Sequence, residues 1–407
     1  MEGYAIMKEG TTSEAEIIRL RQDVSSLFRR RILEAVELVL EEELNEALGT
    51  KRYERSEGRL GYRNGHETRR ITTEVGPQTL AVPRGRIVEA DGSSREFRSE
   101  VLPRYARRTR RVDEAILGAY LAGANTRRIR KALEPLLGSE HLSKSAVSRV
   151  TARLKEQFAA WCERDLSNEH WAIVFLDGFH LKVRMARRVV SVPVLAVLGV
   201  AADGTKQLVA LSLAVSEAQT HWAKVIADLA RRGMPSPALI VSDGHRGLAK
   251  AIEAWPHAQV QRCAVHKWTN LKEHCPVHAH AELKRDYHAI VYAKSGLAAR
   301  DAYRAFVVKW SKLCAPVVRS LEEAGEKLLT FYAFPKPMWS GLRTTNSIEN
   351  LNREFRRRTK TQASFPSEES AVTLLYGLVA FGQIVMRRLR GYRHVLESLI
   401  PKTQSAA

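Results

Sequence analysis

The sequence has few cysteines and no long apolar run. Only four cysteines are spread over 407 residues, which is not the dense spacing of a disulfide framework and fits a reducing compartment. It contains no run of about 18 or more apolar residues and no signal-peptide pattern, so it gives no indication of a membrane-spanning or secreted protein. We therefore expect a folded, cytoplasmic protein.

Acidic residues are the scarcer charge. There are 45 Asp and Glu against 65 Lys and Arg, which gives a net charge of +20 and a pI near 10.0. Such a balance favours a polyanionic partner, with nucleic acid ahead of a membrane surface, because neutralising phosphates releases counterions. With 44% hydrophobic and 27% charged residues, the chain can form substantial cores in two to four domains.

The N-terminal region contains a helix followed by a basic segment. Residues 11–48 carry a capping box at Ser13 and Glu16 and predict a helix that could pack or self-associate. Residues 51–111 contain 16 Lys and Arg against 8 Asp and Glu. Within them, residues 70–75 and 78–83 flank Gly76-Pro77 and predict a hairpin. Arg84 and Arg86 just beyond it could lie along DNA or could simply be solvated.

Three helices are expected next, over residues 112–124, 126–137 and 145–164. The turn at residues 138–143 and the segment after it resemble the entry to the recognition helix of a helix-turn-helix, whose N-terminal end meets base edges. The candidate DNA-binding residues there are Lys144, Ser145, Ser148 and Arg149. Helix pairs with serine caps are common, so the motif alone is weak.

An alternating α/β pattern begins after residue 165. Strands are predicted at residues 171–176, 189–200, 207–215, 238–241 and from 260, with helices at 216–232 and 246–254. The order β-β-β-α-β-α-β is that of a ribonuclease H-like core, a mixed five-stranded sheet with flanking helices. Residues 267–333 predict an all-α insertion, and residues 368–389 a long apolar helix. The expected domains are 1–50 (helical), 51–111 (basic hairpin), 112–165 (helix-turn-helix-like), 166–266 (first part of the catalytic core), 267–335 (insertion) and 336–407 (last part of the core).

Two aspartates follow predicted strands. Asp177 and Asp243 each precede a glycine at the carboxyl end of an apolar strand, and the first and fourth strands of this topology run side by side. Two neighbouring carboxylates repel each other unless a cation lies between them, and a divalent metal is the usual solution. The alternative for each is an ordinary Asp-Gly turn.

Glu349 lies at the start of a basic helix. From Asn346 onward the apolar side chains fall on one face, and Glu349 shares a neighbouring face with basic residues, namely Arg353, Arg356, Arg357 and Lys360. A carboxylate can hold a cation while nearby arginines contact phosphates. Alternatively, Asn346 is the N-cap and Glu349 the N3 member of a capping box.

The chain as a whole resembles the bacterial insertion-sequence transposases of the Mutator type, a branch of the DDE transposases. The resemblance is carried by Gly61-Tyr62-Arg63-Asn64-Gly65, Val82-Pro83-Arg84, Ser145-Ala146-Val147-Ser148-Arg149, Leu176-Asp177-Gly178, Val241-Ser242-Asp243-Gly244-His245, Arg262-Cys263-x-x-His266-Lys267 and Arg343-Thr344-Thr345-Asn346 through Glu349 to Thr359.

That resemblance implies a catalytic and metal-binding triad of Asp177, Asp243 and Glu349. It further implies two Mg²⁺ ions, for which Mn²⁺ would substitute, and metal-assisted cleavage and joining of DNA strands. The implied partners are double-stranded DNA, at the terminal inverted repeats and the target, and further copies of the chain in a homodimer or larger complex associated with the nucleoid. Arg63 and Arg356 would contact DNA. Arg353 and Arg357 would either contact phosphate near the site or simply be solvated at the surface.

Cys263 and His266 allow two interpretations. With Cys275 and His278 they could form a four-ligand zinc site. The resemblance covers only Cys263 and His266, which favours a role in supporting the acids or positioning DNA, and zinc is not expected. A non-catalytic DNA-binding protein and, more weakly, a resolvase or ribonuclease remain as alternative functions. The three acids favour the enzyme, because a binding module has no need of carboxylates facing phosphate.

Overall fold

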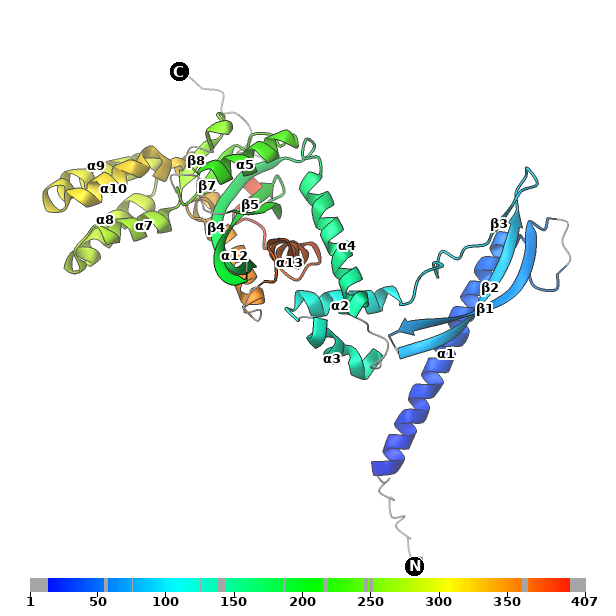
Figure 1. The fold of residues 1–407 in the computed structure, drawn as a ribbon. Coiled ribbons are helices and arrows are strands. Elements are labelled where there is room, and N and C mark those ends of the chain that lie inside the picture. The colour runs from blue at the N-terminus through cyan, green and yellow to red at the C-terminus, as the bar shows by residue number, and fades with distance from the viewer. Residues whose placement is uncertain are drawn as a thin grey trace, which may run out of the picture. The chain divides into compact units, whose positions relative to one another are not determined.

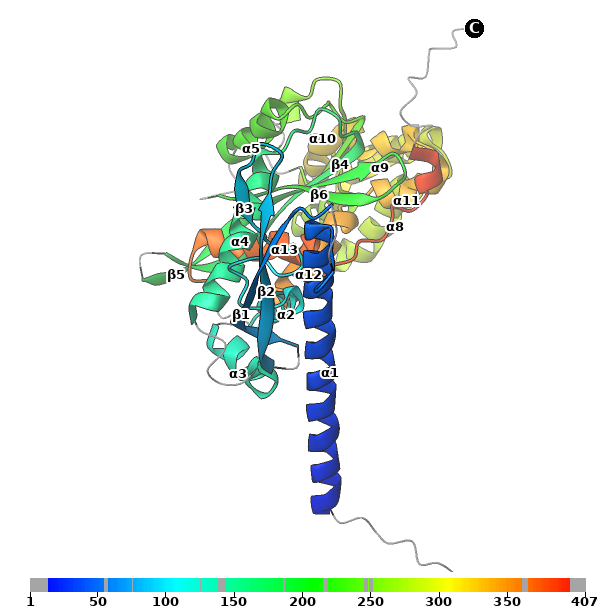
Figure 2. The same ribbon diagram turned by 90° about the vertical axis from the view of Figure 1, so that its right-hand side faces the viewer.

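The computed structural model describes residues 14–54, 58–74, 76–124, 126–137, 144–185, 187–214, 219–244, 248, 252–360 and 365–395. They form two compact units, unit 1 (Met1–Tyr120 and Ala124–Val150) and unit 2 (Leu121–Gly123 and Thr151–Ala407). Figures 1 and 2 show both units, and each is considered by itself below. Among the described helices, none combines the length and the apolar character needed to cross a bilayer.

Unit 1 is built on a long helix and a small antiparallel sheet. Helix α1 (Glu14–Leu48) contacts a sheet in the order β1-β2-β3, formed by β1 (Gly61–Thr73), β2 (Gly76–Val88) and β3 (Ser94–Glu96). Leu40 and Leu44 of the helix are buried with apolar residues of the strands. Gly85 permits this close approach, since a Cβ there would lie 2.7 Å from Leu44 Cδ1. The predicted hairpin is confirmed, and its strands extend well beyond the predicted ends.

Three further helices follow, close to their predicted bounds. They are α2 (Arg110–Leu121), α3 (Thr126–Leu137) and α4 (Lys144–Glu163). Val112, Ile116, Ile129, Leu137 and Val147 form a separate small core between them. The turn at residues 138–143, on which the helix-turn-helix interpretation depends, lies outside the described residues.

Unit 2 contains a mixed five-stranded sheet in the order β6-β5-β4-β7-β8. Its strands are β4 (Trp171–Met185), β5 (Arg188–Ala201), β6 (Lys206–Leu213), β7 (Leu239–Ser242) and β8 (Gln259–Arg262). β5 is antiparallel to both of its neighbours, whereas β4, β7 and β8 are parallel. The predicted adjacency of the first and fourth strands of this sheet is therefore confirmed.

Helices cover both faces of this sheet (Figure 1). Val174 and Leu176 of β4 are buried in a core with Trp222 and Ile226 of α5 (Gln219–Arg231). Because side chains alternate along a strand, Asp177 points to the other face. There α12 (Asn346–Thr359) and α13 (Glu368–Ala380) contact β4. The last helix is shorter than predicted, because the chain turns at Gly382 with a φ of 66°.

An all-α segment separates β8 from α12, as predicted. Its longer helices are α7 (Ala264–Glu273), α8 (His280–Val291), α9 (Gly296–Leu313) and α10 (Ala315–Ala324), followed by short 3-10 turns (η3 to η5) and by α11 (Trp339–Leu342). They share their own core around Leu283, Phe306 and Trp310. The two ends of the segment meet, since Ala264 N donates to Arg343 O at 2.8 Å.

Candidate functional site

The parallel pairing of β4 and β7 brings two aspartates to the same level of the sheet. Leu176 is paired with Ser242, so the next residues, Asp177 and Asp243, come level with each other. Asp243 follows the last residue of β7, as expected. Asp177 was expected at a strand end, which is wrong. β4 continues to Met185 because its pairing with β5 persists beyond Asp177, so Asp177-Gly178 is not a turn.

Asp177 is held in a buried environment of like charge. Its side chain is 9% exposed, and its Oδ2 accepts a 2.8 Å hydrogen bond from Asn352 Nδ2 of α12. Burial and the neighbouring carboxylates of Asp243 and Glu349 raise the pKa of Asp177 to about 7. His266 and the bond from Asn352 act in the opposite direction. The carboxylates of all three acids therefore interact electrostatically at this point of the sheet.

The N-terminus of α12 positions Glu349. Thr345, not Asn346, is the N-cap, and it forms no side-chain capping bond. Glu349 consequently lies one position beyond N3, and the capping-box interpretation is wrong. Instead, the Thr345 hydroxyl is hydrogen-bonded to Glu349 Oε1, and its oxygen lies 3.2 Å from Cys263 Sγ and 3.3 Å from His266 Nδ1. One buried hydroxyl thus orients the carboxylate of Glu349.

Cys263 and His266 complete this polar cluster. His266 Nδ1 lies 3.8 Å from Glu349 Oε1. The hydrogen bond with Cys263, followed by the charges of Cys263, Glu349 and Asp243, raises the pKa of His266 to about 9 against the effect of its burial. Burial alone would raise the pKa of the Cys263 thiol, but hydrogen bonds with His266 and Thr345 lower it below its usual value. At neutral pH the imidazolium therefore offsets part of the negative charge.

The four-ligand zinc arrangement is not formed. Cys263 precedes the first residue of α7 and Cys275 follows its last turn. A ten-residue helix rises by about 15 Å, which keeps these two sulfur atoms far apart. The potential ligand atoms of Cys263, His266 and Glu349 instead lie within 4.8 Å of one another.

The donor chemistry of the acids suits a hard divalent cation. Asp177, Asp243 and Glu349 offer carboxylate oxygens, which Mg²⁺ and Mn²⁺ prefer. Asn352 Oδ1 is a buried acceptor without a hydrogen-bond partner in the described part of the chain. Burial first, and then the charges of Asp243 and Glu349, raise the pKa of Asp177, and a cation bound at this point would offset both effects. These residues therefore fit a divalent metal.

Gly244 and Arg262 fix the loop that carries Asp243. The glycine has a φ of 75° and lies against the guanidinium, so an added Cβ would be 1.5 Å from Arg262 Nη1. That nitrogen donates to the Gly244 carbonyl, and Nη2 lies 3.2 Å from Glu323 of α10. The Glu323 carboxylate also binds the fully buried ammonium of Lys267 at 2.6 Å. The insertion thus supports the Asp243 loop from the side.

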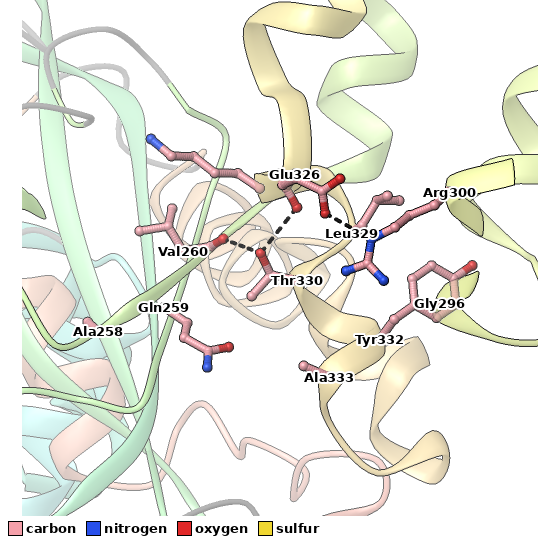
Figure 3. A pocket seen from close by; sticks show the side chains of 11 residues that line it. Ala258, Gln259, Val260, Gly296, Arg300, Glu326, Leu329, Thr330, Tyr332 and Ala333 are labelled. Atoms are coloured by element: carbon pink, nitrogen blue, oxygen red, sulfur yellow. Dashed lines mark hydrogen bonds and ion pairs between the residues drawn. The ribbon is translucent and has the colours of Figure 1, made fainter. Parts of the chain in front are cut away.

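Two hollows flank this part of unit 2. A cavity of about 760 Å³ is lined by Asp243, His266 and Arg262 together with residues of α7 and α10. A second cavity, of about 520 Å³, lies between β8 and the insertion (Figure 3). Two of its polar lining side chains are already paired, since Thr330 Oγ1 donates to Val260 O at 2.7 Å and Arg300 Nε lies 3.3 Å from Glu326 Oε2. Of these two cavities, the first is the one lined by one of the three acids, Asp243.

The basic residues of α12 differ in their surroundings. Arg356 is exposed, with its guanidinium carbon 5.7 Å from the centre of the Phe179 ring. Arg353 donates to Asn350 Oδ1 at 2.7 Å, and Arg357 forms a 2.6 Å ion pair with Glu354. Arg356 is thus the member of this group that lies above β4.

The predicted DNA-binding residues of the N-terminal half are mostly exposed. Arg84 and Arg86 project from β2, and Ser145, Ser148 and Arg149 from α4. The Lys144 side chain lies outside the described part of the structure. Arg63 is half-buried and forms a 2.8 Å ion pair with Glu41 of α1, so it helps to join the sheet to the helix.

Sequence reasoning did not select Asn352 or Thr345 as site residues. A signal existed for Asn352, which lies three residues after Glu349 on a helix and therefore close to the same face. For Thr345 no local signal is sufficient, because its partners Cys263 and His266 lie about 80 residues earlier.

Comparison with known proteins identifies the family. The family model described as "Transposase, Mutator family" matches residues 6–382. The chain belongs to this family. The Mutator-family transposase is 34% identical over 371 residues to the transposase for insertion sequence element ISRM5 of Rhizobium meliloti, covering 91% of each chain. It is also 31% identical over 371 residues to the IS905 transposase of Lactococcus lactis, covering 89% of this chain and 91% of the relative. A third relative, 31% identical over 344 residues, is the transposase for IS256 in transposon Tn4001 of Staphylococcus aureus.

Proposed function

We propose that this transposase binds the terminal inverted repeats of its own element and catalyses metal-dependent cleavage and transfer of DNA strands. The observation that carries the proposal is the meeting of three acids from separate elements: Asp177 on β4, Asp243 after β7 and Glu349 on α12. The family supports an enzyme that processes DNA. The strand order with one antiparallel member supports a ribonuclease H-like core.

The three acids would hold divalent cations, Mg²⁺ or Mn²⁺. When bound, such ions neutralise the scissile phosphate and acidify an attacking water or 3′-hydroxyl. The side chains around them keep the carboxylates in place. Asn352 donates to one oxygen of Asp177, and the Thr345 hydroxyl is hydrogen-bonded to one oxygen of Glu349. Preorganised ligands of this kind avoid the cost of reorientation during the reaction.

Basic residues would bring the DNA backbone to these acids. The net charge of +20 supports attraction of DNA to the whole chain. Arg356, exposed on the same helix as Glu349, is placed to contact a phosphate near the site. Arg84, Arg86 and the exposed side chains at the start of α4 would hold the element ends. Pairing of two ends would require a homodimer or a larger assembly.

A cleavage assay tests the proposal. A labelled duplex carrying an element end is incubated with the wild-type protein in Mg²⁺ or in EDTA, and with the Asp177→Asn, Asp243→Asn and Glu349→Gln variants. We expect cleavage only by the wild type with Mg²⁺, and retained duplex binding by all variants. Glu354→Gln, on the same helix as Glu349 but partly exposed and paired with Arg357, is the matched control and should cleave normally.

Two results would contradict this function. Cleavage by the Asp177→Asn, Asp243→Asn or Glu349→Gln variant at the wild-type rate would show that the acid replaced is dispensable. Binding of the element end by the wild type without cleavage, in either Mg²⁺ or Mn²⁺, would favour the non-catalytic DNA-binding protein instead.

A further inference from the structure

Cys263, His266 and Glu349 form a second set of potential metal ligands beside Asp177 and Asp243. One ligand atom from each of the three, a sulfur, a nitrogen and an oxygen, lies within 4.8 Å of the other two. His266 Nδ1 is 3.8 Å from Glu349 Oε1. Ligand atoms bound to one tetrahedral zinc ion lie roughly 3.3–3.5 Å apart, because each is about 2.0–2.3 Å from the metal. Small rotations of these side chains would therefore let all three atoms bind one ion.

The starts of two helices place these ligands. Cys263 is the N-cap of α7, and His266 lies in the first turn of that helix. Glu349 lies in the first turn of α12, whose N-cap is Thr345. A helix N-terminus favours negative charge, so the two ends stabilise a thiolate and a carboxylate, which are the forms of Cys and Glu that bind metal. The backbone N–H of Thr345 also donates to Cys263 Sγ at 3.4 Å and orients the sulfur.

The three ligand atoms differ in kind from those of the acids. A thiolate and an imidazole suit Zn²⁺ and similar borderline cations, whereas Mg²⁺ prefers oxygen ligands alone. Three protein ligands leave the fourth tetrahedral position of zinc for water. The side chains of His266 and Glu349 are 39% and 35% exposed, and His266 lines the cavity of about 760 Å³. An ion can therefore reach these ligands from solvent.

We propose that Cys263, His266 and Glu349 bind one zinc ion or a similar borderline cation, and that this ion inhibits strand cleavage. The inhibition rests on the proposed function, because Glu349 is shared between the two metal sites. The zinc would hold one oxygen of Glu349 and add two positive charges close to the acids. His266 already interacts electrostatically with both Asp177 and Asp243. Binding of Mg²⁺ to the acids would therefore be weakened while zinc is bound.

Cobalt absorption spectroscopy of the reduced, full-length protein tests the site without DNA. Co²⁺ binds the ligands that Zn²⁺ binds, and a thiolate ligand adds a charge-transfer band in the near ultraviolet. We expect one equivalent of Co²⁺ to produce this band and Zn²⁺ to abolish it by displacement. Cys263→Ser should abolish the band and raise the Kd for Zn²⁺ at least about 100-fold, since even the partners of metal ligands contribute about 10- to 100-fold.

Other substitutions in the same assay provide the controls. Cys275→Ser is matched to Cys263→Ser, because Cys275 is also a buried free cysteine and follows the end of α7, and it should keep the band. His266→Asn and Glu349→Gln should each raise the Kd for Co²⁺ at least about tenfold, and they test the site even if Cys263→Ser does not fold. Asp177→Asn should keep the band, because Asp177 belongs to the acids alone. Circular dichroism shows which variants are folded.

Three spectroscopic results would overturn the metal site. Co²⁺ could give no thiolate band, the band could persist in Cys263→Ser, or it could be lost in Cys275→Ser, which would assign the metal to another cysteine.

The inhibition is measured in the cleavage assay. Zn²⁺ added to the Mg²⁺ reaction should stop cleavage by the wild type and by Cys275→Ser at the concentration that fills the site. Unchanged cleavage at that concentration would overturn the inhibitory role. A protein that never cleaves DNA would contradict the proposed function, whereas the cobalt spectra would still decide whether the metal site exists.

Discussion

Replacing Asp177 with asparagine should stabilise the metal-free transposase. The pKa of Asp177 is raised from an ordinary value of 3.8 to about 7 in the folded chain, so the folded state opposes ionisation of this group. The resulting loss in the free energy of unfolding is absent below about pH 4, grows as the pH rises to about 7 and is constant above that. At about 1.4 kcal/mol for each pH unit, it reaches roughly 4 kcal/mol at pH 8 and roughly 2 kcal/mol at pH 5.5. Asparagine is close in shape and its oxygen can still accept the bond from Asn352.

Urea unfolding in EDTA, followed by tryptophan fluorescence, measures this effect. All seven tryptophans lie in unit 2, so the signal reports the unit that contains Asp177. Asp177→Asn should raise the free energy of unfolding by up to about 4 kcal/mol at pH 8 and by about half as much at pH 5.5. Glu354→Gln, which replaces a partly exposed acid on α12, should change this free energy by less than about 1 kcal/mol at either pH.

Addition of Mg²⁺ should make the wild type more stable to urea than Asp177→Asn. Metal that binds only the folded state stabilises it by mass action, and the wild type should gain more than Asp177→Asn, which lacks one carboxylate ligand. If Asp177→Asn were destabilising in EDTA, or had the same effect at both pH values, the reasoning that Asp177 is buried among like charges would be refuted.

Two further substitutions test the residues that support the acids. Thr345→Val removes the hydroxyl bonded to Glu349 while keeping the shape of the side chain. It should lower the strand-cleavage rate about 10- to 100-fold and raise the Mg²⁺ concentration needed for half-maximal activity. Thr345→Ser keeps the hydroxyl and should retain the wild-type rate and Mg²⁺ requirement, so equal rates for the two variants would contradict a positioning role. Glu323→Gln leaves the buried ammonium of Lys267 without its carboxylate and should lower the free energy of unfolding by about 2 kcal/mol in urea, allowing for the exposure of Glu323. The adjacent exposed Glu322→Gln is its control, and a similar loss in both variants would argue against the ion pair.

The sequence predicted the parts of this fold that depend on local pattern. Apolar runs located the five strands of unit 2, and their order implied that the strands carrying Asp177 and Asp243 are neighbours, which the register confirms. The helical character of residues 267–333 and the bounds of the N-terminal helices were also predicted. Each of these features is encoded in residues close together in the chain.

Features fixed by distant partners were missed. Asp177-Gly178 has the composition of a turn, but pairing with β5 carries β4 through it. Three consecutive residues are of a type suited to the N-cap of α12, namely Thr344, Thr345 and Asn346. The N-cap is Thr345, which also contacts Cys263. The bond from Asn352 to Asp177 spans 175 residues. No local pattern reports these long-range contacts, although they determine how the acids are held.

The closed base of the helical insertion has a consequence for the architecture. The backbone of Ala264 is bonded to that of Arg343, and Cys263 contacts Thr345. The chain therefore leaves the sheet and returns to almost the same place, so the insertion is a separate helical subdomain with its own core. The number of residues in the insertion therefore sets how far apart Asp243 and Glu349 are in the sequence, but not how far apart they are in space. Among proteins that share this arrangement, the interval between the second and third acids can vary widely while the geometry between them stays the same.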